Sequence, residues 1–351
     1  MFLNISKYHR IFAFFCFLAL SIYLYFYRKA IENGSRRSTK RISRFEIFNQ
    51  RSGFLEHASV YTIYKNIEAF TPTGTFIIAT VLDSTKLHYL RSLRESLDPI
   101  IAISAAILVG RPSEITFIEE EFSQPNTRLS FVTSREPASE ESWFPNNLLR
   151  NVARNLTTTC DYFLLIDIDL GISPGFVERL EIFLKNISNT NSKDLLLVPV
   201  FEKESSTKIN SFQDLEENYE NGKVQMFHAW CTEWCYSFYN FPKWFDKTKQ
   251  NPNRTEVGYE IKYKLSFEPY YLGRLDSAPF YDTRFQGYGY NKVEQCYEAA
   301  LQKFTFKVMT SIWLVHDGIK NETEGAGANQ QKFNQYLFNM KKRELKQKYL
   351  L

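Results

Sequence analysis

The sequence has few cysteine and histidine side chains and little net charge, and each of these shortages excludes certain functions. Its 351 residues include only 5 cysteines and 5 histidines, and the formal net charge is just +4. A charge this small, much of it in one N-terminal stretch, does not favour nucleic-acid binding. Metal-dependent hydrolases and phosphodiesterases usually need a fuller set of His and Asp side chains than this chain supplies. Neither an internal repeat nor a low-complexity block is present, and the length leaves room for one large domain or two modest ones.

The cysteines give little guidance. Cys160, Cys231, Cys235 and Cys296 follow the N-terminal apolar run, whereas Cys16 lies inside it. Four cysteines permit two disulfides in any of three pairings. A metal site at Cys231 and Cys235 is only weakly indicated, because no second close cysteine pair and no histidine pair accompanies them.

One long hydrophobic run stands near the N-terminus, at residues 11–27. Its length is at the short limit for a transmembrane helix, and we expect an uncleaved signal anchor. A cleaved signal peptide is the alternative, since Ala19-Leu20-Ser21 resembles a cleavage site. Seven basic residues follow the run, so the positive-inside rule by itself would place the carboxyl side in the cytosol.

Other features favour a lumenal domain. Five glycosylation sequons lie beyond the run, at Asn33, Asn155, Asn186, Asn253 and Asn321. In a chain rich in asparagine, some of them are expected by chance.

From Thr75 onward, apolar strands alternate with amphipathic helices. Strands are predicted at 76–82, 100–109, 129–132, 162–168 and 195–201, and helices at 87–97, 114–122, 146–155 and 174–184. This alternation predicts an α/β domain with a mostly parallel sheet covered on both faces.

The strand at 162–168 ends in an Asp-Ile-Asp sequence. In a strand, Asp167 and Asp169 project to the same side, at the carboxyl end where ligands of open α/β sheets bind. Two carboxylates there suit a divalent metal that also holds a substrate diphosphate, as in nucleotide-sugar transferases. The alternative is a solvated acidic turn, because Ser173-Pro174-Gly175 follows closely.

Beyond Glu202 the α/β rhythm stops and aromatic residues become dense. Glycines alternate with tyrosines in the segment 280–292, which suits a polar groove, although an aromatic-packed turn explains any single Tyr equally well.

Six motifs, in this order and spacing, resemble glycosyltransferase family 49. They are Phe144-Pro-Asn-Asn-Leu-Leu-Arg-Asn151, Phe163-Leu-Leu-Ile-Asp-Ile-Asp169, Val198-Pro-Val-Phe-Glu202, Phe267-Glu-Pro-Tyr270, Tyr281-Asp-Thr-Arg-Phe-Gln-Gly-Tyr-Gly-Tyr-Asn-Lys292 and Leu314-Val-His-Asp-Gly318. The resemblance covers residues 75 to the end. It departs at 231–235 and 240–259, where loops that set specificity are expected.

The resemblance implies a GT-A type nucleotide-diphospho-sugar transferase fold, Mn²⁺ dependence and a UDP-sugar donor. It also implies inverting transfer of glucuronate to a glycan hydroxyl on a glycoprotein, at a Golgi membrane with type II topology. The chain then divides into a cytoplasmic tail (1–10), a transmembrane signal anchor (11–27), a stem (28–70) and a lumenal glycosyltransferase domain (71–351). The oligomeric state stays open.

Roles at the site follow from the matched motifs. Asp167, Asp169 and His316 are expected to bind the metal, and His316 would otherwise be a structural histidine. Arg150, Asn151, Asp167 and Ile168 are expected at the donor, with a surface ion pair as the alternative for Arg150.

For the catalytic base, Asp282 is the first choice and Glu268 the second. If Asp282 pairs with Arg284, the pKa of its carboxyl falls and it becomes a poor base. The acceptor groove is assigned to Trp230, Tyr288, Tyr290, Asn291 and Lys292, with core packing as the alternative for the aromatic rings. The donor carboxylate needs a cation, for which Arg150, Arg284 and Lys292 are the candidates.

Three other hypotheses remain. The protein is an inactive, glycan-binding or complex-forming homologue, a UDP-N-acetylglucosamine-dependent transferase, or a metal-dependent hydrolase that uses the same carboxylates.

Overall fold

A computed structural model describes residues 45–47, 61–66, 74–122, 124, 126–134, 143–155, 160–187, 191–231, 237–320 and 327–350. The strands are β1 (Phe45–Ile47), β2 (Tyr61–Asn66), β3 (Phe76–Asp83), β4 (Ala102–Leu108), β5 (Thr127–Ser134), β6 (Tyr162–Asp167), β7 (Leu170–Ile172), β8 (Asp194–Val198), β9 (Val200–Lys203), β10 (Val224–Met226), β11 (Val257–Ile261), β12 (Tyr270–Arg274), β13 (Thr305–Met309) and β14 (Leu314–Asp317). The helices are η2 (Ser84–Lys86), α2 (Leu87–Ser96), α3 (Ser113–Glu121), α4 (Asn146–Arg154), α5 (Phe176–Asn186), α6 (Phe212–Glu220), α7 (Phe241–Gln250), α8 (Val293–Leu301) and α9 (Ala328–Lys348).

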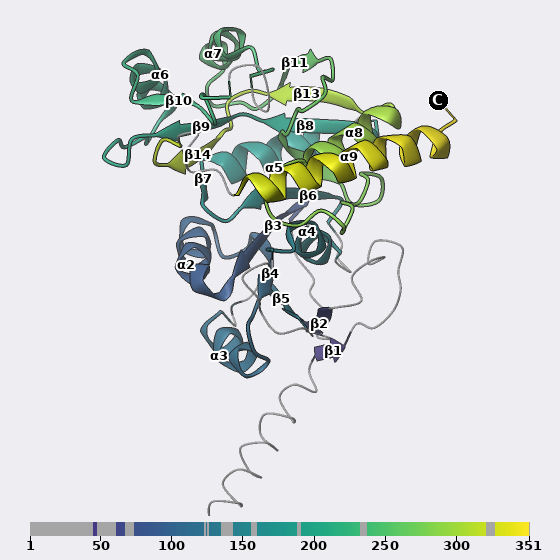
Figure 1. The fold of residues 1–351 in the computed structure, drawn as a ribbon. Helices are drawn as coiled ribbons and strands as arrows, with labels where there is room; N and C mark the ends of the chain where they lie inside the picture. The colour runs from purple at the N-terminus through teal and green to yellow at the C-terminus, as the bar shows by residue number, and fades with distance from the viewer. Residues whose placement is uncertain are drawn as a thin grey trace, which may run out of the picture.

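The described strands form two sheets (Figure 1). The larger has ten strands in the order β1-β2-β5-β4-β3-β6-β12-β8-β13-β11. Its centre, β5-β4-β3-β6, is parallel, as the alternation predicted.

The prediction of a mostly parallel sheet is nevertheless wrong, because five of the nine pairings are antiparallel. Strand β12 lies between β6 and β8 and runs antiparallel to both. It begins at Tyr270, at the end of the Phe267-Glu-Pro-Tyr270 motif, where no strand was expected. The direction in which a strand enters a sheet depends on the long connection that precedes it. The five residues of β12 themselves carry no pattern that reveals this direction.

The smaller sheet has the order β10-β9-β14-β7. Among the described residues, the chain passes from the large to the small sheet three times, between β6 and β7, between β8 and β9, and between β13 and β14. The second passage corrects another prediction: the single strand expected at 195–201 is divided at Pro199. Proline has no N–H to donate, so neither ladder continues through it.

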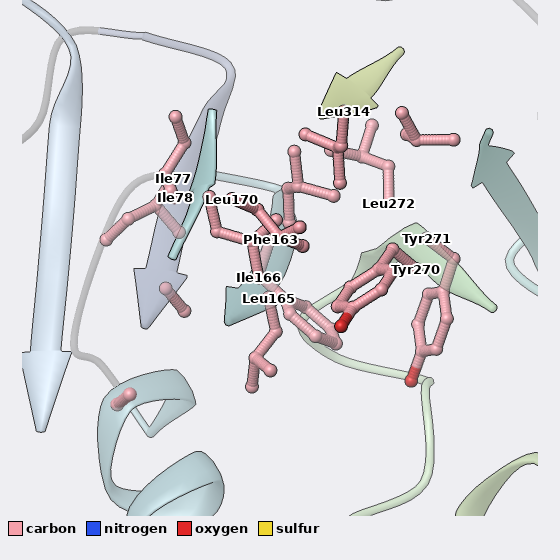
Figure 2. Close-up of a cluster of buried hydrophobic side chains, with 14 of the residues drawn as sticks. Ile77, Ile78, Phe163, Leu165, Ile166, Leu170, Tyr270, Tyr271, Leu272 and Leu314 are labelled. Atoms are coloured by element: carbon pink, nitrogen blue, oxygen red, sulfur yellow. The ribbon is translucent and has the colours of Figure 1, made fainter. Parts of the chain in front are cut away.

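Part of the hydrophobic core lies where the two sheets meet. Figure 2 shows Ile77 of β3, Phe163 and Ile166 of β6, Leu272 of β12 and Leu314 of β14 in one cluster, and each is buried. Burying each such side chain stabilises the fold by roughly 1.5 to 3 kcal/mol. The junction is therefore a rigid base for the residues at its rim.

The N-terminal part of the chain is largely outside the described residues. The predicted tail and anchor, residues 1–27, lie wholly outside them and remain predictions. Within the described residues, no helix combines the length and the apolar character that crossing a bilayer requires.

Two smaller predictions concern the surface and the cysteines. Asn186 and Asn253 are exposed and Asn155 is half-buried, whereas Asn33 and Asn321 lie outside the described residues. Cys296 is a free, buried thiol on α8. Two disulfides would have to use all four cysteines that follow the N-terminal apolar run, so that arrangement is not formed.

A candidate glycosyltransferase site

A cavity of about 1010 Å³ opens at the junction of the two sheets. Most of the predicted site residues line it, although they come from distant parts of the chain. These are Arg150, Asp167, Ile168, Asp169, Trp230, Glu268, Tyr288, Tyr290, Asn291 and Lys292. Asn151, Asp282 and His316 do not line it.

Asp169 and His316 meet at the edge of the cavity. The passage from β6 to β7 carries Asp169, and β14 pairs with β7 so that His316 lies opposite Leu170. The Asp169 Oδ2 atom is 3.4 Å from His316 Nε2. On the other side of the ring, Nδ1 donates a hydrogen bond of 2.7 Å to the Gly318 carbonyl oxygen.

This hydrogen bond determines what fits between the two side chains. With the proton on Nδ1, the neutral imidazole of His316 turns a lone pair on Nε2 toward a carboxylate oxygen. Two lone pairs at this distance require a cation between them, either a second proton on the ring or a metal ion. Adjacent ligands of an octahedral ion with bonds of about 2.1 Å are about 3 Å apart. A backbone carbonyl that holds the other ring N–H is also typical of metal-binding histidines.

Asp167 has different partners. Its Oδ2 accepts a hydrogen bond from the Tyr270 hydroxyl and lies 3.4 Å from Lys292 Nζ, and its Oδ1 lies 3.6 Å from Arg150 Nη2. Burial alone would raise the pKa of the Asp167 carboxyl, but Lys292 and Arg150, with the hydrogen bond from Tyr270, lower it well below its usual range.

The expected three-residue metal set is thus divided. Asp169 and His316 lie together, whereas Asp167 is held by cations. Over the described parts of the chain, no three His, Cys, Asp or Glu side chains gather into a ligand set. Asp169 and His316 would hold a divalent ion by two protein ligands, which would leave its other positions to water and substrate oxygens. The nitrogen and oxygen donors suit Mn²⁺ better than Mg²⁺. Lys320 Nζ, 3.6 Å from Asp169 Oδ2, supplies part of the positive charge here.

A glycine-rich loop forms one wall. Gly287 and Gly289 have φ values of 63° and 88°, and Tyr290 has 59°. In this conformation Asn291 accepts a hydrogen bond of 2.9 Å from Arg150 Nη1 and donates one to the Gly287 carbonyl oxygen. Arg150 is buried, not a surface ion pair.

The two predicted tyrosines of this loop differ. Tyr290 stacks on Phe338 of α9 at 5.3 Å between ring centroids, as core packing would require. Tyr288 is half-buried in the cavity wall, and its backbone N–H donates to Gln330 Oε1.

Glu268 is the carboxylate best placed to act as a base. It lines the cavity, and it accepts no hydrogen bond and forms no ion pair with any described residue. Burial raises the pKa of its carboxyl, although Lys292 and Arg150 oppose the shift. A carboxylate with a raised pKa takes up a proton more readily.

Trp230 forms another wall of the cavity with His228. The indole is 37% exposed, so part of its face is open to a ligand, and its centroid is 5.7 Å from that of His228. Burial, with the nearby charges of Lys292 and Lys320, lowers the pKa of His228 to about 3, so this ring is neutral.

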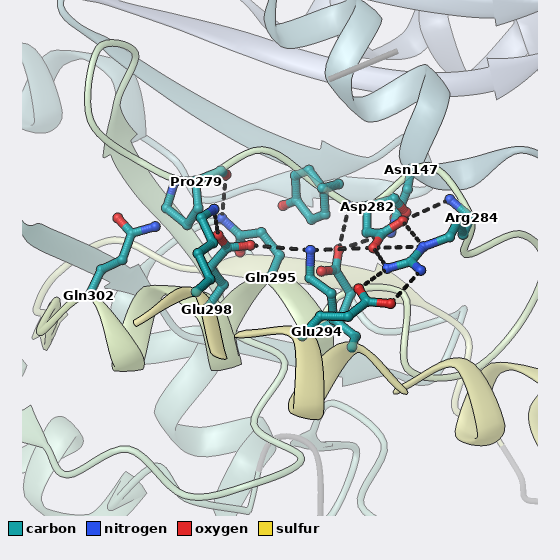
Figure 3. A network of polar contacts seen from close by, with 12 residues as sticks. Asn147, Pro279, Asp282, Arg284, Glu294, Gln295, Glu298 and Gln302 are labelled. Atoms are coloured by element: carbon teal, nitrogen blue, oxygen red, sulfur yellow. Dashed lines mark hydrogen bonds and ion pairs between the residues drawn. The ribbon is translucent and has the colours of Figure 1, made fainter. Parts of the chain in front are cut away.

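Asp282 lies in a separate polar network between α8, α9 and the 281–284 turn (Figure 3). Its carboxylate contacts the Arg284 guanidinium at 2.6 Å and Lys341 Nζ at 3.3 Å. Burial alone would raise its pKa, but the hydrogen bonds from Arg284 and the charge of Lys341 lower it. Arg284 also pairs with Glu344. A carboxylate held in this way and turned from the cavity is not placed to be a base, and Arg284 is not placed to meet a donor.

Asn151 has a structural position as well. Its side-chain amide donates to the carbonyl oxygen of Tyr281 and accepts from the N–H of the same residue. Asn151 therefore fixes the segment that leads into the network and does not face a donor.

Sequence reasoning missed several cavity residues. Asp83 ends β3 as Asp167 ends the neighbouring β6, and a polar residue at the end of a buried strand was a signal that could have found it. No local pattern pointed to His228 or Lys320.

With this geometry in view, comparisons with known proteins define the class. The model of the family described as "Glycosyl-transferase for dystroglycan" matches residues 80–350. The chain belongs to this family of glycosyltransferases, as the six motifs indicated.

Particular relatives are similar over part of their length. "Beta-1,4-glucuronyltransferase 1" of Danio rerio is 31% identical over 209 residues, which are 59% of this chain and 48% of that protein. "Xylosyl- and glucuronyltransferase LARGE1" of Gallus gallus is 31% identical over 185 residues, 50% of this chain and 22% of that protein. The chain thus spans about half the length of the first of these relatives, and less of the second.

Among solved structures, one titled "Crystal structure of GalNAc-T7 with UDP, GalNAc and Mn2+" overlaps with a TM-score of 0.45 at 7% identity, covering 76% of this chain and 48% of that chain. This distance is too great to transfer any residue or ligand.

Proposed function

We propose that this protein is a metal-dependent glycosyltransferase that transfers glucuronate from UDP-glucuronate, with inversion, to a hydroxyl of a glycan. The observation that carries the proposal is the Asp169–His316 pair, whose facing lone pairs need a cation at the rim of a cavity large enough for a nucleotide sugar. The names of the relatives favour glucuronate as the sugar.

The charge of the cavity supports both the metal and the donor. Its lining carries four acidic side chains (Asp83, Asp167, Asp169 and Glu268) and four basic ones (Lys86, Arg150, Lys292 and Lys320). Such a balanced site has no net attraction for a donor with about three negative charges. A bound divalent ion would change that balance in favour of the donor and would neutralise charge on the departing diphosphate.

Lys292 is our candidate for the donor carboxylate. Its side chain is 11% exposed at the cavity, where it lies close to Tyr270 and Asp167. Arg150 is less available, because Asn147 and Asn291 already accept hydrogen bonds from its Nη1. An unpaired buried carboxylate costs several kcal/mol, so a neutral sugar and a glucuronate demand different surroundings.

Glu268 is our candidate for the base. The acceptor hydroxyl oxygen forms a bond to the anomeric carbon, the bond from that carbon to the diphosphate oxygen breaks, and the hydroxyl proton moves to the Glu268 carboxylate. Direct attack from the face opposite the leaving group inverts the anomeric centre. Arg150 and Lys292 hold Asp167 at the cavity wall, and Trp230 offers an aromatic face to a pyranose ring.

The cellular setting is also part of the proposal. We place residues 1–10 in the cytosol, 11–27 in the Golgi membrane and 71–351 in the lumen, on the basis of the hydrophobic run and the sequons beyond it.

A donor screen tests the proposal. The purified chain from residue 71 onward, or the full chain in detergent, is incubated with UDP-glucuronate, UDP-N-acetylglucosamine, UDP-galactose, UDP-glucose or UDP-xylose, and UDP release is measured with Mn²⁺ or with EDTA. We expect release from UDP-glucuronate that requires Mn²⁺. Preference for another sugar would overturn the donor, and no release from any of them would favour the inactive, glycan-binding homologue.

A further inference from the structure

Glu202 is a buried carboxylate that the proposed reaction does not use. It lies on β9, in the Val198-Pro-Val-Phe-Glu202 motif, and is 0% exposed. Its Oε1 accepts a hydrogen bond of 2.6 Å from Gln225 Nε2, and its Oε2 accepts one of 3.3 Å from the backbone N–H of His228. None of the described cations lies within ion-pair distance. Burying a carboxyl group in such a place is costly, so its hydrogen bonds have to offset the loss of water.

The sheet register explains how Glu202 reaches the cavity wall. In the small sheet, Glu202 lies beside Gln225 of β10 and beside His316 of β14. Laterally paired residues project to the same face of a sheet. Glu202 therefore lies in one row between His316 and the segment after β10, which is the segment that turns back over the cavity.

The residue that Glu202 holds has an unfavourable backbone conformation. His228 has φ of 55°, the left-handed region that a residue with a Cβ rarely adopts. Its ring stacks on Phe227 at 4.1 Å and lies next to Trp230, and all three residues line the cavity. A hydrogen bond to the His228 N–H stabilises the turn that presents the imidazole and the indole.

We propose that Glu202 is a positioning residue for the glycan acceptor, acting through the His228–Trp230 wall. This inference rests on the proposed transfer reaction. The wall offers a flat aromatic face and a neutral imidazole, which suit the C–H face and the hydroxyl groups of one pyranose unit. Glu202 contacts neither the donor sugar nor the acceptor sugar, so it acts only by ordering the His228–Trp230 wall.

The test compares Glu202→Gln with Glu204→Gln, an exposed carboxylate two residues further along. The glutamine at 202 brings an N–H₂ group to a place where both neighbours are donors, so one hydrogen bond is lost. UDP release from the donor is measured without acceptor and with a panel of methyl glycosides (β-xyloside, β-galactoside, β-glucoside, α-mannoside). For the glycoside used best by the wild type, we expect the KM of Glu202→Gln to rise about tenfold, the equivalent of one hydrogen bond. Acceptor-independent release, its Mn²⁺ dependence and the properties of Glu204→Gln should stay unchanged.

A charge-swapped variant gives the rescue. In Glu202→Gln/Gln225→Glu, the amide at 202 donates to the new carboxylate and its oxygen accepts from the His228 N–H, so acceptor KM should return toward the wild-type value. The swap also serves if Glu202→Gln alone does not fold. An altered Mn²⁺ dependence at normal acceptor KM would overturn the inference, because Glu202 would then act through the neighbouring His316. An unchanged KM in both variants would overturn it as well. If the wild type releases no UDP, the proposed function itself fails.

Discussion

At the scale of single residues, two carboxylates with the same predicted role lie in different environments. Asp282 and Glu268 both lie in motifs that resemble the family, and both were candidate bases. Asp282 lies between Arg284 and Lys341, where its charged form is stabilised, whereas Glu268 has no polar partner among the described residues and faces the cavity. The same chemical group is thereby a structural anion in one place and, in our proposal, the proton acceptor in the other.

Glu268→Gln should reduce transfer by roughly 10² to 10⁴-fold while donor binding is retained, because the amide cannot take the acceptor proton. Kinetics and a UDP-glucuronate titration monitored by calorimetry measure the two effects. Since burial raises the pKa of Glu268, activity should fall with decreasing pH through a value above the 4.3 or so of an exposed glutamate. Asp282→Asn is the control and should lower thermal stability more than kcat. If Asp282→Asn lowered kcat strongly and Glu268→Gln did not, Asp282 would be the base.

His316→Ala tests the metal pair. Removing the imidazole should weaken Mn²⁺ binding, measured directly by electron paramagnetic resonance, and weaken UDP binding with it, because diphosphate affinity depends on the shared ion. The melting temperature without metal should hardly change. If His316 is a structural residue instead, metal binding persists and the fold loses about 1 to 3 kcal/mol.

At the scale of elements, the site depends on short connections. The 287–291 loop needs left-handed backbone at three positions so that Asn291 can reach Arg150. Only two of those three positions are glycine, and the third, Tyr290, is stabilised by stacking on Phe338 of α9.

Gly289→Ala should therefore destabilise the protein by about 1 kcal/mol or more, since φ is 88° and the new Cβ would lie 3.2 Å from Gln331 Cγ. It should also raise the KM for the donor, because Arg150 loses its orientation. Thermal unfolding and steady-state kinetics give both numbers. Gly327→Ala is the matched control, because a Cβ added there would meet no described atom within 4 Å and φ is −42°. Equal effects of the two substitutions would contradict this account of the loop.

At the scale of the whole molecule, α9 is joined to the rest of the domain by ion pairs. Lys341 and Lys348 contact Glu298 of α8, and Glu344 contacts Arg284. Glu294 lies within the same network, where its Oε1 accepts hydrogen bonds from Asn147 Nδ2 and from the Asp282 N–H (Figure 3).

Burial raises the pKa of Glu294 well above its ordinary value, so the folded state retains its proton at pH values where the unfolded chain has lost it. Stability then falls as pH rises from the unfolded pKa toward the folded one. Glu294→Gln removes this pH-dependent loss of stability. The melting temperature of the variant, relative to that of the wild type, should therefore rise between about pH 5 and pH 8. Glu344→Gln is the control of opposite sign, because the pKa of Glu344 is lowered mainly by Arg284. Parallel stability curves for the wild type and Glu294→Gln would show that Glu294 is ionised when folded.

Topology is the second prediction at this scale. The exposed positions of Asn186 and Asn253 lead us to expect that a glycosidase increases the mobility of the expressed protein on a gel and that Asn186→Gln and Asn253→Gln each remove one glycan. Protease added outside intact microsomes should leave the domain intact. Digestion of the domain, together with no mobility shift, would place it in the cytosol.

The sequence by itself determined the parallel centre of the large sheet, the position of Asp167 and Asp169 at its edge, and the family. These depend on periodicity and on residues that are neighbours in the chain, so local patterns carry them. Only the tertiary structure decided the rest. In that structure β12 lies antiparallel inside the large sheet, and the strand expected at 195–201 is divided at Pro199. Asp282 lies away from the cavity, and Asp167 pairs with Arg150 and Lys292. Each of these depends on which distant segments pack together, because burial and the charge of a spatial neighbour set the role of a side chain, and neither is written in the residues beside it.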